Sequence, residues 1–206
     1  MANICTASVY FYTDKNTDDL EKMHNDFEIF LKYDSEKSLN TFCQHVLDME
    51  DLGFSTNRGD LSDVDGITWI SGYSALLVEF NFAWSPSYAA INALAQKYGV
   101  SWCSSADEAG YCSFDVVGDE NAAFFESEYM TDIWDKDLFI DGKDMHEVGS
   151  QFFKDKAGLT AFLNSLNTDF VPNESDPVSS WNDYLYEELG IGKIVTFNRK
   201  SVSDVI

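Results

Sequence analysis

The sequence predicts an α+β protein, in which helices cover one face of an antiparallel sheet. Short runs of β-branched and aromatic residues alternate with segments whose apolar residues recur every three or four positions. Turn and cap residues separate these segments. The 206 residues are 45% hydrophobic and 15% aromatic, which is enough to build a core and excludes a disordered acidic chain.

The beginning of the chain supplies a strand, two helices and a loop. Residues 3–12 are rich in β-branched and aromatic side chains, which favours a strand. From Asp18 onward the apolar residues have helical spacing, and a second helical stretch follows Ser38. Residues 53–66 have the glycine and polar content of a loop.

Two paired strands and a helix are expected next. Residues 67–73 and 75–83 have the composition of strands. The second run is apolar almost throughout, so we expect it to be central in the sheet. The step Ser85-Pro86 is typical of a helix start, and Gly99 is typical of a helix end.

Strands at about 100–105 and 111–117 complete this region, with a turn at 107–110 between them. The order is strand, helix, helix, strand, strand, helix, strand, strand. This order favours a ferredoxin-like antiparallel sheet with helices on one face, formed by residues 1–118.

An α-rich C-terminal extension, residues 119–206, is expected to pack on the same core. The sequence predicts a short helix and a strand in 121–134, a helix over 144–167, a loop over 169–179, a helix over 180–189 closed by Gly190, and a strand at 193–198.

Three short segments, Met1–Cys5, Phe82–Pro86 and Asp107–Tyr111, carry a family resemblance. They are similar to motifs of the YubB ferredoxin-like family, a domain of unknown function found on plasmids and phages. Ile4 stands where that family usually has Trp, and Ser87 stands where it has a second Pro. The resemblance implies a ferredoxin-like fold and a mobile-element origin, and it brings no known activity.

The step Trp84-Ser85-Pro86 has a structural interpretation. We expect Trp84 to end a strand and to pack, Ser85 to cap the helix and Pro86 to begin it. A binding role for Trp84 is the alternative.

Charge is the outlying property of the composition. Asp and Glu total 36 against 13 Lys and Arg, a formal charge of -23. Such a surface repels nucleic acid and anionic membranes, and it attracts basic proteins over about a Debye length. Solubility alone, or a salty habitat, remains the alternative explanation.

The sequence predicts a cytoplasmic protein of the host cytosol. The opening residues lack the basic and apolar regions of a signal peptide, and no apolar run approaches the about 18 residues of a membrane span. Cys5, Cys43, Cys103 and Cys112 are far apart, and we expect them to be reduced, mostly buried thiols.

No catalytic or metal-ligating pattern is found, so the sequence predicts neither an enzyme nor a bound metal or cofactor. The three histidines are not at ligand spacing from one another or from a cysteine. Asp60–Gly66 resembles a calcium loop, but an EF-hand would need acids where Leu61 and Gly72 stand. A looser cation site in this segment is the alternative.

The acids are distributed unevenly. Residues 59–130 contain 11 acids and one base, Lys97. Protein surfaces usually interleave both signs, because like charges repel and destabilise the folded state. Because so few bases offset these acids, the pattern favours a functional role for the negative electrostatic field of the protein.

We therefore predict a partner-binding surface built from acidic side chains. A strand would place Glu126 and Glu128 on one face. A helix would align Asp137, Asp141 and Asp144 in one acidic stripe. The predicted set is Asp60, Asp63, Asp65, Asp107, Glu108, Asp119, Glu120, Glu126, Glu128, Asp137, Asp141 and Asp144.

Such a surface would imitate the rows of phosphates along a duplex. The sequence predicts a nucleic-acid mimic from a phage or plasmid, which occupies the basic groove of a host nucleic-acid-binding defence protein and acts as an anti-CRISPR or anti-restriction inhibitor. The rival hypothesis is an immunity or accessory protein for a basic toxin or conjugation factor. Five aromatic residues are candidate anchors, with core packing as the alternative: Trp69, Trp102, Phe114, Tyr129 and Trp134.

Overall fold

A computed structural model gives the fold and describes residues 4–108, 113–119, 121–133, 139–140, 143–144, 151–165, 170–190 and 192–206. Contacts group the chain into two units, which are residues 1–125 with 198–206 (unit 1) and residues 126–197 (unit 2). The predicted domain boundary lies earlier, after residue 118. No helix within the described ranges is long and apolar enough to cross a membrane.

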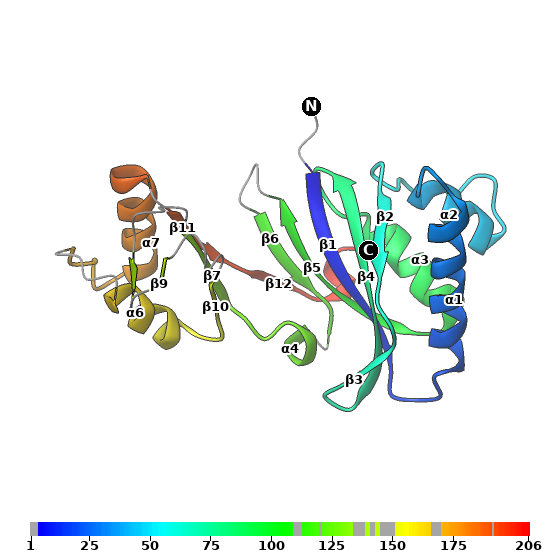
Figure 1. The fold of residues 1–206 in the computed structure, drawn as a ribbon, viewed down its shortest axis with the longest axis horizontal. Helices are drawn as coiled ribbons and strands as arrows, with labels where there is room; N and C mark the ends of the chain where they lie inside the picture. Colours follow the sequence, from blue (N-terminus) through cyan, green and yellow to red (C-terminus); the bar gives the residue numbers. More distant parts are fainter. Residues whose placement is uncertain are drawn as a thin grey trace. The chain divides into compact units, whose positions relative to one another are not determined.

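The centre of unit 1 is an antiparallel arrangement of long strands (Figure 1). β1 (Ile4–Thr13) pairs with β4 (Tyr73–Ala83) on one side and with β5 (Ser101–Glu108) on the other. β2 (Asp60–Val64) pairs with β4 and ends the strand order on that side. The spatial order β5-β1-β4-β2 brings together segments that are far apart in the sequence.

Shorter strands extend this sheet. β6 (Ser113–Val117) pairs antiparallel with β5, and β12 (Asn198–Lys200) pairs parallel with β6. β3 (Thr68–Ile70) forms a hairpin with the beginning of β4. The chain is therefore a mixed α/β protein with a mostly antiparallel sheet, which confirms the predicted class in this coarser form.

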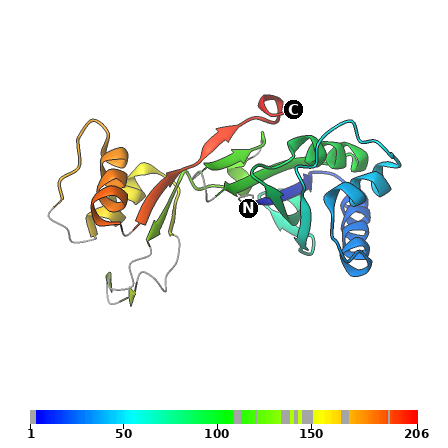
Figure 2. The same cartoon turned by 90° about the horizontal axis from the view of Figure 1, so that it is seen from above.

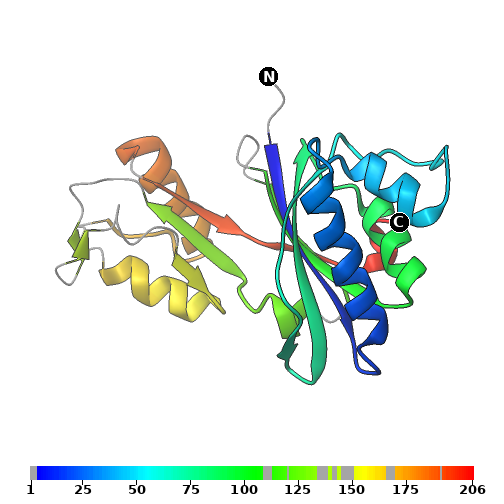
Figure 3. The same ribbon diagram turned by 45° about the vertical axis from the view of Figure 1, so that its right-hand side comes forward.

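The helices α1 (Asp18–Tyr33), α2 (Leu39–Leu47) and α3 (Tyr88–Tyr98) lie on one face of this sheet (Figure 2, Figure 3). Successive strand residues point to opposite faces, so every second residue of a strand contacts the helices. The buried residues of β1 and α1 at this interface are Cys5, Ala7, Val9, Phe11, Leu20, Met23 and Phe27.

Phe27 lies at the centre of this core, fully buried between the helices and the sheet. Its ring stacks on Phe42 with centroids 4.5 Å apart and meets Phe80 edge-on at 6.2 Å. We expect Phe27→Ala to lower the free energy of unfolding by about 3–5 kcal/mol, because the change leaves a cavity that the aromatic neighbours cannot fill. Urea denaturation measures this loss. The half-buried Phe30 provides a control, and a Phe30→Ala loss as large as that of Phe27→Ala would contradict the prediction.

β2 lies within a segment predicted as a loop, and that prediction is wrong for residues 60–64. Its sequence has little strand propensity, and Leu61 is its buried residue. Pairing with β4 creates the strand, and a β-bulge between Leu61 and Asp63 interrupts the register. A tertiary partner, which local sequence does not reveal, decides the structure here.

α3 begins later than predicted. Ser87, rather than Ser85, is the N-cap residue, and its Oγ accepts a hydrogen bond from Ala90 N at 3.3 Å. Pro86 therefore precedes the cap instead of beginning the helix. Gly99 ends the helix in the left-handed region with φ of 67°, as predicted.

The second face of the sheet is partly covered by α4 (Asn121–Phe124) and the residue after it. The Phe124 ring lies 5.0 Å from the ring of Tyr10 and 4.7 Å from that of Tyr12, and the Phe125 ring lies 5.4 Å from Tyr10. This aromatic cluster occupies the end of the face where β1 terminates. Near the beginning of β1, the same face carries the polar side chains of Thr6 and Ser8.

Unit 2 has its own small sheet and core. β7 (Tyr129–Ile133) pairs antiparallel with β10 (Gln151–Phe153) and with β11 (Gly192–Thr196). The helices α6 (Lys156–Ser165) and α7 (Pro177–Asn182) contribute to its apolar cluster. The buried residues of the cluster are Leu159, Leu163, Trp181, Leu185 and Ile194.

The helix predicted over 144–167 is wrong in part. Residues 151–153 form β10, and α6 begins only at Lys156, where Asp155 Oδ1 accepts a hydrogen bond from Gly158 N at 2.8 Å. Residues 145–150 and 166–169 lie outside the described residues. The later helix is present as α7 and the π-helical segment Asp183–Leu189, and Gly190 closes it as predicted. β8 (Phe139–Ile140) and β9 (Lys143–Asp144) pair with each other.

Candidate functional site

The face of the unit 1 sheet opposite the helices carries polar side chains near the beginning of β1. Alternation along β1 points Thr6 and Ser8 to this face, because Cys5, Ala7 and Val9 point to the core. The register continues the same face onto β4, β2 and β5. We call the following set the acidic face: Thr6, Ser8, Asp60, Asp63, Glu79, Asn81, Ser105 and Asp107.

The acidic face consists of two rows across four strands. The first row is Asp60, Asn81, Thr6 and Asp107, and the second row is Asp63, Glu79, Ser8 and Ser105. Neighbouring strands lie about 4.8 Å apart, and residues two apart on a strand lie about 6.7 Å apart. The carboxylates of Asp63 and Glu79 are therefore direct neighbours in the second row.

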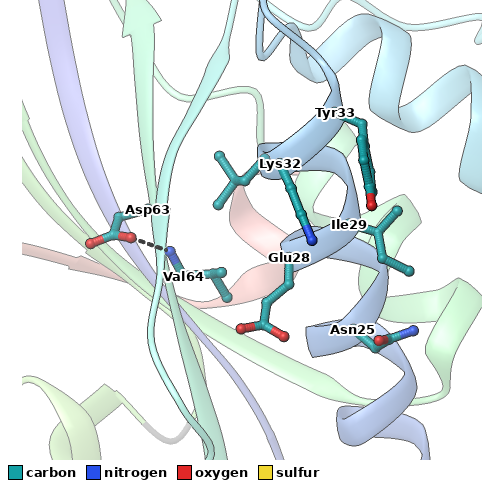
Figure 4. A pocket seen from close by; sticks show the side chains of 8 residues that line it. Asn25, Glu28, Ile29, Lys32, Tyr33, Asp63 and Val64 are labelled. Atoms are coloured by element: carbon teal, nitrogen blue, oxygen red, sulfur yellow. Dashed lines mark hydrogen bonds between the residues drawn. The ribbon is translucent and has the colours of Figure 1, made fainter.

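The bulge in β2 determines which acid reaches this face. In a regular strand that has Asp60 on the acidic face, Ser62 would share the face and Asp63 would point to the helices. The bulge shifts the pairing, so that Asp63 lies opposite Glu79. Figure 4 shows the Asp63 carboxylate on the side of β2 away from α1, where its oxygen accepts a hydrogen bond from Val64 N at 2.9 Å.

The acidic face holds its side chains by local hydrogen bonds. Ser8 Oγ donates to Glu79 Oε1 at 2.7 Å, and Thr6 Oγ1 donates to Asn81 Oδ1 at 3.2 Å. Within the described part of the chain, no Lys or Arg forms an ion pair with Asp60, Asp63 or Glu79. Their negative charges are therefore not neutralised by those groups.

Two titratable groups on or beside this face have raised pKa values. Burial raises the pKa of Tyr10, and Cys103, Asp65 and Glu79 raise it further in that order. Partial burial also raises the pKa of Asp60. At the far end of the second row, the Arg199 guanidinium donates to Phe125 O at 2.7 Å. Arg199 lies on β12, two strands beyond Ser105 of the second row.

The structure brings several of the predicted site residues together. Asp60, Asp63 and Asp107 belong to the acidic face. Asp65 follows β2, where its backbone N donates to Leu77 O at 3.0 Å. Glu108 is the last residue of β5, and its side chain lies outside the described residues.

Other predicted site residues lie elsewhere. Asp119 is exposed and lines a separate hollow at the other end of β1, with Asp14 and Lys15. Glu126 and Glu128 belong to unit 2 and precede β7, so the prediction that they share a strand face is wrong.

The remaining predictions concern unit 2 and residues outside the described ranges. Glu126 forms an ion pair with Lys154, with Oε2 and Nζ 3.1 Å apart. Asp144 lies in β9, so the predicted helical stripe is wrong for that residue. Glu120, Asp137 and Asp141 lie outside the described residues.

Glu79 is the site residue that the sequence analysis missed. The sequence predicts that the run 75–83 is central in the sheet because it is apolar almost throughout, and the structure has β4 between β1 and β2. Glu79 and Asn81 nevertheless alternate with the core residues Phe80 and Phe82. This period of two was the available signal, and it indicates one polar face.

The aromatic candidates divide between core and surface. Trp102 is buried, and Tyr129 packs half-buried in the unit 2 cluster, so core packing explains both. Trp69 on β3 is 72% exposed. The Phe114 side chain and all of Trp134 lie outside the described residues.

Trp84 contradicts the expectation that it packs, since it is 54% exposed. Its φ is 71°, and Ser85 N donates to Ala83 O at 3.1 Å, which closes a γ-turn around it. A γ-turn with positive φ at its centre is rare and strained. Such strain costs about 1–3 kcal/mol and persists only where the surroundings enforce it.

A hollow of about 600 Å³ lies between α1 and β2 (Figure 4). Glu28 and Lys32 bring opposite charges to it from α1, so it favours no single sign of partner. The residues that line it are Asn25, Glu28, Ile29, Leu31, Lys32, Tyr33, Asp63 and Val64. The acidic face, rather than this hollow, has a defined electrostatic character.

The thiols of Cys5, Cys43 and Cys103 are buried and reduced, as predicted for those three, and Cys112 lies outside the described residues. Burial raises the pKa of Cys43 to about 12. The thiol of Cys43 therefore stays protonated at pH 8, and we expect no alkylation by iodoacetamide until urea unfolds the protein. Peptide mass spectrometry measures this. Rapid modification of Cys43 in the native state would contradict it.

No group of three or more His, Cys, Asp or Glu side chains in the described ranges is arranged to hold a metal ion. The site that the described residues define in this mixed α/β protein is the acidic face of the unit 1 sheet. No family model matches the chain, and searches of the curated proteins and of the solved structures find no match either.

Proposed function

We propose that the acidic face binds the basic surface of a nucleic-acid-binding protein and thereby blocks its access to nucleic acid. The observation that carries this proposal is the pair of adjacent rows in which Asp60, Asp63 and Glu79 form no ion pair with a described Lys or Arg. Complementary charge steers such partners together and determines which partners fit. The chain acts by binding and not by catalysis.

The geometry of the face supports mimicry of nucleic acid. Duplex DNA carries one negative charge per about 1.7 Å of axis, in regular rows. Side chains on a paired sheet have regular spacings of about 4.8 and 6.7 Å. Because the hydrogen bonds from Ser8 and Thr6 restrain Glu79 and Asn81, binding costs less conformational entropy than it would with a flexible acidic segment.

The proposal extends to the fold and origin. The order β5-β1-β4-β2, with α1 and α3 as connections on one face, supports a ferredoxin-like arrangement of unit 1. The resemblance to the YubB ferredoxin-like family supports an origin on a phage or plasmid. The partner is then a host defence protein such as a CRISPR or restriction effector.

Release of DNA from candidate effectors tests the proposal. We expect the protein to displace duplex DNA from at least one CRISPR or restriction effector in an electrophoretic mobility assay. Its affinity for that effector should fall steeply as salt rises from about 50 to about 200 mM, because both surfaces release counterions. If no effector loses DNA, or if salt has no effect, the proposal fails.

A further inference from the structure

A hollow of about 590 Å³ lies where α2 and β2 begin. The segment before α2 pairs there with the beginning of β2, since Leu39 N donates to Gly59 O and Leu61 N donates to Lys37 O, each at 2.8 Å. This pairing fixes the first turn of α2 beside the loop that leads into β2. Residues from both segments line the hollow.

The first turn of α2 brings an unpaired backbone donor to this hollow. Ser38 and Asn40 line it. Ser38 is the N-cap residue of α2, but its side chain makes no cap hydrogen bond. Within the described part of the chain, Asn40 N forms no hydrogen bond either. Free N–H groups and the helix dipole attract anions to a helix N-terminus.

A buried hydroxyl group in the same hollow also lacks a partner. Thr56 lines the hollow and is only 8% exposed. Its Oγ1 forms no hydrogen bond with a described residue, yet the atom is not sealed from solvent. A molecule in the hollow can therefore reach this hydroxyl. Most buried polar groups in proteins have a partner, so a free hydroxyl on a side chain buried to nine-tenths points to a bound molecule.

The hollow carries charges of both signs that do not neutralise each other. Arg58 lines it, and the guanidinium forms no ion pair with a carboxylate in the described ranges. Glu36 and Asp60 line it as well. An unpaired arginine is unexpected in a chain with 36 acids against 13 Lys and Arg. A ligand that carries both charges suits such a hollow, whereas a simple anion would meet the two carboxylates.

We propose that this hollow binds a free α-amino acid. The carboxylate of the amino acid accepts hydrogen bonds from the Asn40 N–H, the Thr56 hydroxyl and the Arg58 guanidinium. Its ammonium group donates to the Glu36 carboxylate. Phe54, which lines the hollow and is partly buried, supplies an apolar wall for the side chain of the amino acid. The volume of the hollow lies within the range of small-molecule sites, about 300–1,000 Å³.

Thermal denaturation with each of the twenty standard amino acids at about 10 mM tests the proposal. We expect at least one of them to raise the melting temperature by about 3–6 °C, which corresponds to a dissociation constant of about 1 mM. If none of the twenty raises the melting temperature, the inference is overturned.

Blocked derivatives of the best amino acid test whether both charges are needed. The N-acetyl derivative lacks the ammonium group, and the amide lacks the carboxylate. Each should bind at least about tenfold more weakly than the free amino acid, because each leaves a charged group of the hollow without its partner. Isothermal titration calorimetry measures the difference. Equal affinity for the free amino acid and either derivative would refute a site for a zwitterion.

Thr56→Val removes the unpartnered hydroxyl with little change in side-chain size. The variant should bind the amino acid about tenfold more weakly, because a hydrogen bond to a charged group is lost. Its melting temperature without ligand should equal that of wild type or exceed it. Thr68→Val on β3, at an exposed position, is the matched control and should leave the affinity unchanged. Wild-type affinity in Thr56→Val, or a lower melting temperature without ligand, would contradict the inference.

Glu36→Gln tests the partner of the ammonium group at an exposed position outside the core. Affinity for the free amino acid should fall about two- to fivefold. Affinity for the N-acetyl derivative should not fall, since that molecule has no ammonium group. Equal losses for both molecules would show that Glu36 does not recognise the ammonium group. These assays contain no protein partner, so their results are independent of the function proposed for the acidic face.

Discussion

Neutralising the acidic face is expected to weaken binding to the proposed basic partner by about tenfold to a hundredfold. The variant carries Asp60→Asn, Asp63→Asn, Glu79→Gln and Asp107→Asn, which remove charge with little change in side-chain size. Each exposed ion pair with a partner contributes about 0.2–1 kcal/mol. Four such contacts contribute about 0.8–4 kcal/mol in total, and the middle of that range changes the dissociation constant by about tenfold to a hundredfold, since about 1.4 kcal/mol corresponds to a factor of ten.

Salt dependence and a matched variant make this test specific. The logarithm of the affinity should also fall less steeply with salt in the neutralised variant, because fewer counterions are released. The control neutralises four exposed carboxylates of the helical side, at Asp19, Glu21, Asp48 and Glu50. These groups lie away from the acidic face, so screening should limit their effect. Equal losses in the two variants would show that only net charge matters, which contradicts the proposed site.

Gly118→Ala is expected to lower the free energy of unfolding by about 3–5 kcal/mol. A Cβ at this position would lie 2.4 Å from Cys103 Cβ and 2.8 Å from Cys103 Cα. The φ of 139° is also unfavourable for any side chain. Overpacking and backbone strain each cost about 1–3 kcal/mol. Thermal denaturation should show a fall of about 10 °C for a chain of this size.

Gly53→Ala separates backbone strain from overpacking. Gly53 also has a positive φ, of 69°, but a Cβ there would meet no atom within 4 Å. We expect this variant to lose only about 1–2 kcal/mol, which is the cost of the left-handed conformation. If Gly118→Ala is as stable as Gly53→Ala, then β5 moves to accommodate the added Cβ, and the prediction for Gly118→Ala is wrong.

The spacing of apolar residues along the chain predicts those helices and strands that bury one regular apolar face. α1 presents Leu20, Met23 and Phe27 at spacings of three and four, and the structure has this helix where the sequence predicts it. The strand β1 is equally recognisable from its composition. These elements follow from local sequence because propensity and burial favour the same conformation.

Elements that depend on a distant partner are not predicted. β2 has a polar sequence and forms against β4, and β10 appears within an expected helix. In both cases hydrogen bonds to a neighbouring strand outweigh local preference. The helix cap at Ser87 and the exposed position of Trp84 likewise depend on contacts with the segment 55–57.

The sequence alone determines the large negative charge of this protein, the class of its fold and the scarcity of bases between residues 59 and 130. The tertiary structure decides which of those acids lie together. A bulge turns Asp63 onto the same face as Asp60, and strand pairing adds Glu79 and Asp107 from distant segments. Composition sets the number of charges, whereas the register of the sheet sets the distances between them, and the interaction between charges depends on distance.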